Sequence, residues 1–152
     1  MISAPTKVLL ADDDKDDREI FSEALSLIDQ NIVYQGVEDG QEAIDILSDD
    51  TRRPNIIFLD INMPVMSGWD VLKKLKSNSQ YQGIPVIVYS TSSGIKEKKT
   101  AFDLGALCFV TKPDSVKLIK AMLEIVVVNL KKNDVSPEMC RQIHRMLKQE
   151  LS

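Results

Sequence analysis

The sequence predicts an α/β protein in which a five-stranded parallel sheet is covered by helices on both faces. Three observations predict this fold: short apolar segments rich in Val and Ile, helical spacing of apolar residues between them, and an ordinary globular composition. The chain has 152 residues, of which 43% are hydrophobic and 28% are charged. This length is enough for one domain with a sizeable core and not for two ordinary ones.

The predicted strands are short and do not alternate apolar with polar side chains. Such runs are typical of strands that are buried on both faces of a parallel sheet. They are expected at residues 7–11, 32–37, 56–59, 85–89 and 106–111. A sheet of this kind carries its ligand site at the carboxyl ends of the strands.

Helices are predicted in the segments between and after these strands. Each is indicated by apolar residues that are spaced to fall on one helix face. The marker residues, in chain order, are Ile20, Phe21, Ala24, Leu25 and Ile28; Ala43, Ile44 and Leu47; Val71, Leu72 and Leu75; Ala101 and Leu104; and Leu118, Ile119, Met122, Leu123 and Val126. Gly105 is expected to end the fourth of these helices.

A sixth helix is predicted after the alternating pattern ends. The segment from Ser136 opens with a capping hydroxyl and a proline, which is a favourable helix start. An apolar stripe follows on a basic helix at Met139, Ile143, Met146 and Leu147. We therefore divide the chain into a domain at residues 1–130 and a linker with a C-terminal helix at residues 131–152. His144 is expected on the solvent side of that helix.

The end of the fifth predicted helix is apolar on almost every side. The residues concerned are Ile125, Val126, Val127, Val128 and Leu130. Because a helix that is apolar all round is usually buried, something is expected to cover it. The C-terminal helix, a partner protein and a second copy of the chain, which would form a homodimer through this region, are the three alternatives.

Charge and cysteine content exclude several classes of function. The chain has 19 basic and 23 acidic residues, a net charge of −4, which argues against broad binding to nucleic acid. Two cysteines outside a Cys-x-x-Cys pair and a single histidine argue against a zinc site. The acidic start is unlike a signal peptide, and no apolar run is long enough to span a bilayer. We expect a cytoplasmic protein with reduced thiols and no membrane partner.

Carboxylates, a hydroxyl and an ammonium group follow the predicted strands. The first strand is followed by Asp12-Asp13-Asp14, the third by Asp60, the fourth by Ser90 and the fifth by Lys112. These side chains are expected at one edge of the sheet. Clustered carboxylates favour Mg²⁺, and a lysine and a hydroxyl suit phosphoryl oxygens. The pattern predicts phosphoryl chemistry with a carboxylate as the acceptor.

The remaining acids of this region have a structural interpretation. Acidic residues that follow a strand often cap the next helix and interact with its dipole. Asp14, Asp16 and Asp17 are therefore expected to stabilise the start of the first helix.

Five segments together resemble the receiver domains of bacterial response regulators. They are residues 8–14 (VLLADDD), 58–68 (FLDINMPVMSG), 85–91 (PVIVYST), 104–106 (LGA) and 111–113 (TKP). The resemblance covers about residues 7–130. It implies a flavodoxin-like sheet with the strand order 2-1-3-4-5 and five helices, to which the C-terminal helix is added.

The resemblance also implies a phosphoacceptor and a metal site. Asp60 would accept a phosphoryl group from a phosphohistidine on a sensor histidine kinase or a histidine phosphotransfer protein. Mg²⁺ would be held by the side chains of Asp13 and Asp60 and by the backbone carbonyl of Asn62. Asp12 would bind the ion through water.

A switch is implied beside this acceptor. Lys112 would pair with Asp60 at rest and with the phosphate afterwards. Ser90 would move to bond a phosphoryl oxygen, and Phe109 would turn inward. The surface of the fourth helix and the fifth strand would change as a result.

Two classes of function remain open. The first is a single-domain response regulator that switches its protein-binding surface when phosphorylated. The alternative is a phosphorylation-independent, receiver-like binding module; the complete set of site residues favours the first. Enzyme classes fit less well. A hydrolase with an Asp nucleophile is expected to carry an acid where this chain has Asn62, and Asp12-Asp13-Asp14 would repel the phosphate of a flavin.

Overall fold

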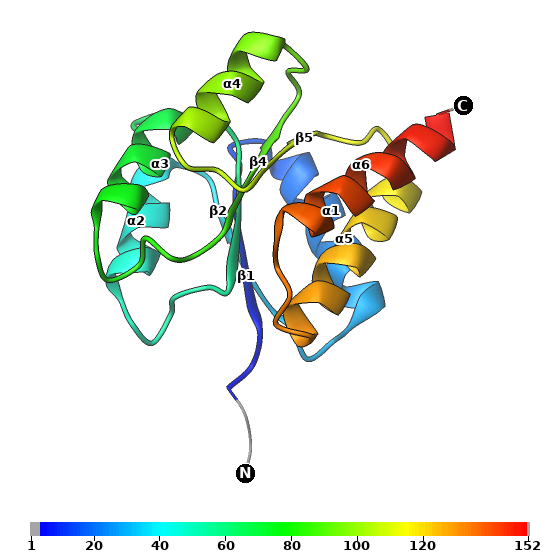
Figure 1. Cartoon of the computed structure of the whole chain (residues 1–152). Coiled ribbons are helices and arrows are strands. Elements are labelled where there is room, and N and C mark those ends of the chain that lie inside the picture. Colours follow the sequence, from blue (N-terminus) through cyan, green and yellow to red (C-terminus); the bar gives the residue numbers. More distant parts are fainter. Residues whose placement is uncertain (1–3, 152) are drawn as a thin grey trace.

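The structure, a computed structural model, describes residues 4–151 and has the predicted doubly wound α/β fold (Figure 1). In this part of the chain, five parallel strands form one sheet in the order β2-β1-β3-β4-β5, which confirms the predicted order. The strands are β1 (Lys7–Ala11), β2 (Val33–Val37), β3 (Ile56–Leu59), β4 (Val86–Ser90) and β5 (Cys108–Thr111).

Helices cover both faces of the sheet (Figure 1). One side carries α1 (Lys15–Ile28) and α5 (Val116–Lys131), and α6 (Pro137–Leu151) packs against α5. The other side carries α2 (Gly40–Ser48), α3 (Gly68–Ser77) and α4 (Ile95–Asp103). Among the helices of residues 4–151, none has both the length and the apolar character that a membrane span needs.

The core is divided by the sheet into two apolar clusters. On the α1–α5 side, the rings of Phe21 and Phe58 meet edge to face with their centres 4.9 Å apart. Phe58 meets Tyr89 in the same way at 5.8 Å. Such aromatic pairs stabilise a core by about 0.5–1.5 kcal/mol each beyond the burial of their area.

β2 departs from the prediction that every strand is buried on both faces. It lies at the edge of the sheet, and Val33 at its start is 39% exposed. The central strands β3 and β4 are buried throughout, as predicted. The apolar run alone did not distinguish an edge strand from a central one, although β2 also contains Gln35 and Gly36.

The predicted stop of α4 is confirmed. Gly105 has a φ of +101°, a left-handed conformation that side chains other than that of glycine rarely adopt. Its N–H donates to the carbonyl oxygen of Phe102 at 3.0 Å, which satisfies one of the last carbonyls of the helix.

Among the three predicted alternatives, the C-terminal helix covers the inner part of the α5 end. Met139 and Ile143 of α6 are fully buried and belong to the same cluster as Val126 and Val127 of α5. Val128, on another side of α5, stays 48% exposed. The helix α6 therefore packs against α5 and joins the cluster that holds two of the apolar residues that made the sequence of α5 unusual.

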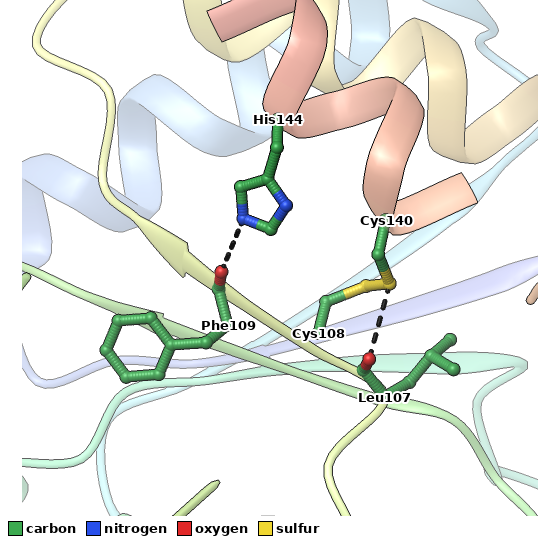
Figure 2. The surroundings of a disulfide bond; sticks show 5 residues. All are labelled: Leu107, Cys108, Phe109, Cys140 and His144. Atoms are coloured by element: carbon green, nitrogen blue, oxygen red, sulfur yellow. Dashed lines mark hydrogen bonds between the residues drawn. A yellow bond between two sulfur atoms is a disulfide. The ribbon is translucent and has the colours of Figure 1, made fainter. Parts of the chain in front are cut away.

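The prediction of reduced thiols is wrong for this structure, because Cys108 of β5 and Cys140 of α6 form a disulfide (Figure 2). Their Cα atoms are 5.7 Å apart, within the usual range for a disulfide. Both residues are buried, at 0% and 7% exposure. Their separation of 32 residues gave no indication of pairing, because only the docking of α6 beside β5 brings them together.

His144 lies next to this disulfide and makes a contact that its sequence did not indicate. It is exposed, as predicted, yet its Nε2 lies 2.9 Å from the carbonyl oxygen of Phe109 (Figure 2). Because a carbonyl only accepts, Nε2 must carry the hydrogen. Phe109, the residue predicted to move in the switch, is thus joined to α6 through its own backbone carbonyl.

Candidate functional site

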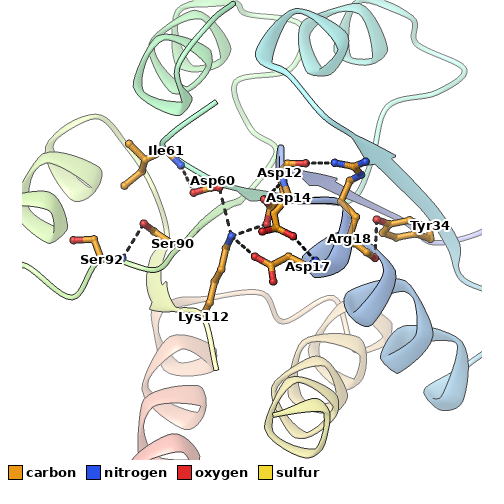
Figure 3. Close-up of polar contacts among 10 residues, drawn as sticks. All are labelled: Asp12, Asp14, Asp17, Arg18, Tyr34, Asp60, Ile61, Ser90, Ser92 and Lys112. Carbon is orange, nitrogen blue, oxygen red and sulfur yellow. Dashed lines mark hydrogen bonds and ion pairs between the residues drawn. The ribbon is translucent and has the colours of Figure 1, made fainter. Parts of the chain in front are cut away.

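The predicted acids meet where β1 and β3 end side by side. The N–H of Asp60 donates to the carbonyl of Ala11 at 2.9 Å, which places Asp60 beside Asp12. One carboxylate oxygen from each of Asp12, Asp13 and Asp60 lies within 4.8 Å of the others. Asp12 and Asp60 are buried, and Asp13 is exposed at the rim. These three residues with Lys112 are called the acid pocket below; Figure 3 shows Asp12, Asp60 and Lys112.

Backbone groups orient the two buried carboxylates. Asp60 Oδ1 accepts the N–H of Ile61 at 2.8 Å, and Asp12 Oδ1 accepts that of Asp14 at 3.0 Å. The buried Asp12 Oδ2 pairs with the ammonium group of Lys112. Three clustered carboxylates form an all-oxygen site, which fits a hard divalent cation. The acid pocket can therefore hold such an ion.

Lys112 reaches the acids from the end of β5. Its Nζ lies 3.4 Å from Asp60 Oδ2, which confirms the predicted pair, and 2.8 Å from Asp12 Oδ2. A third carboxylate, that of Asp17, also lies 2.8 Å away (Figure 3). The side chain of Lys112 is only 10% exposed, so these pairs are shielded from solvent.

The two central groups of the acid pocket have shifted pKa values. Burial raises the pKa of Asp60 to about 6; Lys112 opposes this shift and the negative charge of Asp12 adds to it. Burial alone would lower the pKa of Lys112, but hydrogen bonds to Asp12 and Asp17 hold it above its ordinary value. At neutral pH the lysine is charged and Asp60 is mostly ionised, as a nucleophile must be.

Asp17 is the residue of this site that the sequence interpretation missed. Asp14 is the N-cap of α1, as expected, and its Oδ1 accepts the N–H of Asp17 at 3.0 Å. The carboxylate of Asp17 points instead to Lys112 (Figure 3). These two residues are 95 positions apart, and local helix rules carry no information about such a pair.

Ser90 and Lys112 are held together at the ends of adjacent strands. The N–H of Lys112 donates to the carbonyl of Ser90 at 2.7 Å. Ser90 is buried, and its Oγ accepts the N–H of Ser92 at 3.2 Å. Phe109, in β5, is also buried. Its movement on switching stays a prediction.

The loop after β3 needs glycine at position 68. A Cβ on Gly68 would collide with the backbone carbonyl of Asp60, so only glycine allows this close approach. The Gly68 N–H donates to the carbonyl of Ile61 at 2.7 Å and closes the loop that follows Asp60. Asn62 lies exposed in this loop.

A cavity of about 290 Å³ lies between α4 and α6, beside the acid pocket. Its walls include Lys98 of α4, Phe109 and Lys112 of the β5 region, and His144 and Leu147 of α6. We call it the α4–α6 groove. The groove connects Phe109, one of the predicted switch residues, with the molecular surface.

The family model for the response regulator receiver domain matches residues 8–124. The chain belongs to the response-regulator receiver family. The match contains all the residues of the acid pocket and ends before α6 begins. Receiver domains are signalling modules that interact with histidine kinases or histidine phosphotransfer proteins.

Individual relatives agree with this assignment. The chain is 34% identical to the chemotaxis protein CheY1 of Helicobacter pylori over 121 residues, which are 80% of this chain and 96% of CheY1. The solved structure of the phosphorylated cyanobacterial phytochrome response regulator RcpA has a TM-score of 0.76 and 30% identity over 83% of this chain and 94% of RcpA. The Mn²⁺-bound form of the response regulator Rcp1 has a TM-score of 0.69 and 31% identity over 79% and 90% of the two chains.

Some relatives are much longer than this chain. The match to a probable cyclic di-GMP phosphodiesterase of Vibrio cholerae is 31% identical over 129 residues. It spans 84% of this chain and only 28% of that protein. The similarity therefore concerns one part of the phosphodiesterase.

Proposed function

We propose that Asp60 of this response regulator accepts a phosphoryl group from a phosphohistidine, with Mg²⁺ bound in the acid pocket. The observation that supports this most directly is the meeting of Asp12, Asp13 and Asp60 with Lys112 at one edge of the sheet. A carboxylate between a cation site and an ammonium group is suited to phosphoryl transfer. Both positive groups neutralise charge that spreads over the transferred oxygens.

The proposed step transfers a phosphoryl group between two proteins. An oxygen of Asp60 attacks the phosphorus while the bond from phosphorus to the donor imidazole nitrogen breaks, and the electron pair stays on that nitrogen. Asp60 becomes an acyl phosphate. The chain promotes only its own phosphorylation and the later hydrolysis of this group.

The residues of the acid pocket have distinct proposed roles. Asp13, Asp60 and the Asn62 carbonyl would hold Mg²⁺, and Asp12 would bind it through water. The ion would supply positive charge to the phosphoryl oxygens. Lys112 would move from its carboxylate partners to one of those oxygens, which it can reach from its present position 3.4 Å from Asp60.

The proposed output is a change of the protein-binding surface at the α4–α6 groove. Ser90 would bond a phosphoryl oxygen, and the backbone bond from Lys112 to Ser90 would carry that movement to β5. Phe109 lines the groove, so its position decides the groove's shape. The proposed readout is the binding of another protein there.

The proposed partners and boundaries follow from this role. A sensor histidine kinase or a histidine phosphotransfer protein would be the donor, with the protein in the cytoplasm and without nucleic acid or membrane as partner. Residues 1–130 would form the receiver unit, and residues 131–152 would add the linker and α6. A homodimer through the α5 region stays a prediction; Val128 at 48% exposure is an apolar side chain that it would use.

The proposed function is tested by incubating the chain with Mg²⁺ and acetyl phosphate and recording its intact mass. We expect the chain to gain the mass of one phosphoryl group, and we expect no gain in Asp60→Asn or when EDTA is present during the incubation. Asp16→Asn is the matched control, because Asp16 is an exposed acid outside the pocket. Folded wild-type protein that gains no mass would contradict the proposal and favour the phosphorylation-independent binding module.

A further inference from the structure

Lys112 of the acid pocket also pairs with a residue outside the pocket. Its Nζ lies 2.8 Å from Asp17 Oδ2 and 3.4 Å from Asp60 Oδ2. The resting lysine is therefore nearer to a carboxylate on α1 than to the proposed phosphoacceptor. An ammonium group has three hydrogens to donate, and Asp17 engages one that a phosphoryl oxygen could otherwise receive.

The local structure of α1 leaves the carboxylate of Asp17 available for this contact. Asp14 caps the helix, and its side chain satisfies the N–H of Asp17. The neighbouring Asp16 is exposed, whereas the side chain of Asp17 is 35% exposed and faces Lys112. Two adjacent acids in one helical turn thus have different surroundings, and only Asp17 is joined to the acid pocket.

We propose that Asp17 is a positioning residue that holds Lys112 in its resting place and competes with the phosphoryl group for it. This inference rests on the proposed function and deepens it. Asp17 has opposite effects on the two ligands. Its negative charge attracts a bound cation. By pairing with Lys112 it also reduces the repulsion between the lysine and that cation. The same negative charge repels the phosphoryl group. It also keeps Lys112 in the pair with Asp17, so that the lysine is less available to neutralise the phosphoryl group.

The test compares Asp17→Asn with Asp16→Asn in the full chain. Both remove one negative charge from the first turn of α1, but only the first removes the charge that pairs with Lys112. Two affinities are measured by fluorescence of Trp69, which packs partly buried in the cluster that holds Ile61 and Met63 of the loop after Asp60. The first ligand is Mg²⁺ alone. The second is beryllofluoride, a stable phosphoryl analogue, at saturating Mg²⁺.

We expect Asp17→Asn to weaken Mg²⁺ binding about three- to tenfold and to tighten beryllofluoride binding by about the same factor. Asp16→Asn is expected to change each by less than about twofold, because exposed charges are screened. Asp17→Glu, which keeps the charge, is expected to return both affinities toward the wild-type values. Asp17→Ser repeats the measurement with a second neutral side chain, and thermal unfolding checks that each variant is folded.

Opposite changes in two affinities distinguish competition for Lys112 from a purely structural role. If both ligands bound more weakly to folded Asp17→Asn, or if Asp16→Asn behaved in the same way, the proposed role of Asp17 would be wrong. A wild-type chain that neither binds beryllofluoride nor accepts a phosphoryl group would overturn the proposed function itself. If the wild-type chain binds beryllofluoride and accepts a phosphoryl group, but Asp17→Asn has the wild-type affinities for both ligands, only the proposed role of Asp17 would be overturned.

Discussion

The acid pocket and the contact of α6 with α5 and β5 differ in how they contribute to stability. In the pocket, the carboxylates of Asp12 and Asp60 are both buried, and burial raises the pKa of Asp60. In the α6 contact, Met139 and Ile143 are fully buried and a disulfide joins α6 to β5. The pocket is held in place by the rest of the fold, whereas the α6 contact helps to hold the fold. Substitutions should therefore have opposite effects on stability in the two regions.

The largest effect is expected from the disulfide. Cys140→Ser should lower the free energy of unfolding by about 3–4 kcal/mol, because a cross-link over a loop of this length restricts the unfolded chain. Chemical denaturation of wild type with and without a reductant measures the effect. Reduced wild type should approach the stability of Cys140→Ser, and the variant should not respond to the reductant.

A thiol count is the control for that comparison. Oxidised wild type should show no reactive thiol after denaturation without reductant, because Cys108 and Cys140 are paired. Two reactive thiols in protein purified without reductant would contradict the disulfide. The original prediction of reduced thiols would then hold, and α6 would be docked by its apolar face alone.

The sequence predicted the acid pocket better than the α6 contact, and the reason is physical. Asp12, Asp60 and Lys112 each follow a strand, and a parallel sheet brings such ends to one edge whatever the details of packing. The helix faces follow from the period of the apolar residues. The strand order, in contrast, was predicted only from the resemblance to receiver domains.

The features that the sequence did not predict all depend on tertiary docking. The pair of Asp17 with Lys112 and the disulfide join segments whose approach is decided by side-chain packing. The contact of His144 with the Phe109 carbonyl depends on the angle at which α6 lies on β5. The exposed edge of β2 was missed because an apolar run does not reveal which strand has only one neighbour.

The second effect is a gain of stability from Asp60→Asn in metal-free buffer. Burial makes the charged carboxylate costly, so the neutral side chain should raise the free energy of unfolding by about 1–3 kcal/mol at pH 7. Thermal or chemical denaturation measures this gain. Saturating Mg²⁺ should reduce the difference, because the ion stabilises the wild-type pocket by binding to it. A loss of stability in metal-free buffer would contradict the unfavourable burial of this charge.

The same gain should depend on pH. The pKa of Asp60 in the folded chain is raised from 3.8 to about 6, so the folded state takes up a proton before the unfolded state does. The cost of the charge is fully present above pH 6 and disappears as the pH falls toward 4. The difference in stability between wild type and Asp60→Asn should therefore shrink between pH 7 and pH 4. A constant difference over this range would show that charge is not its cause.

The smallest effect is expected at His144, where the two regions come closest. His144→Ala removes one partly solvated hydrogen bond to the Phe109 carbonyl and should cost about 0.5–1 kcal/mol. Hydrogen exchange should show α6 amides protected about two- to fivefold less, while His144→Gln, whose amide can still donate, should lose less protection. Labelling by acetyl phosphate should be unchanged, because the hydrogen bond of His144 goes to the Phe109 carbonyl and not to a carboxylate of the acid pocket. A change in labelling with α6 still docked would instead mean that this bond links the position of α6 to the switch at Phe109, and the two regions would then act as one.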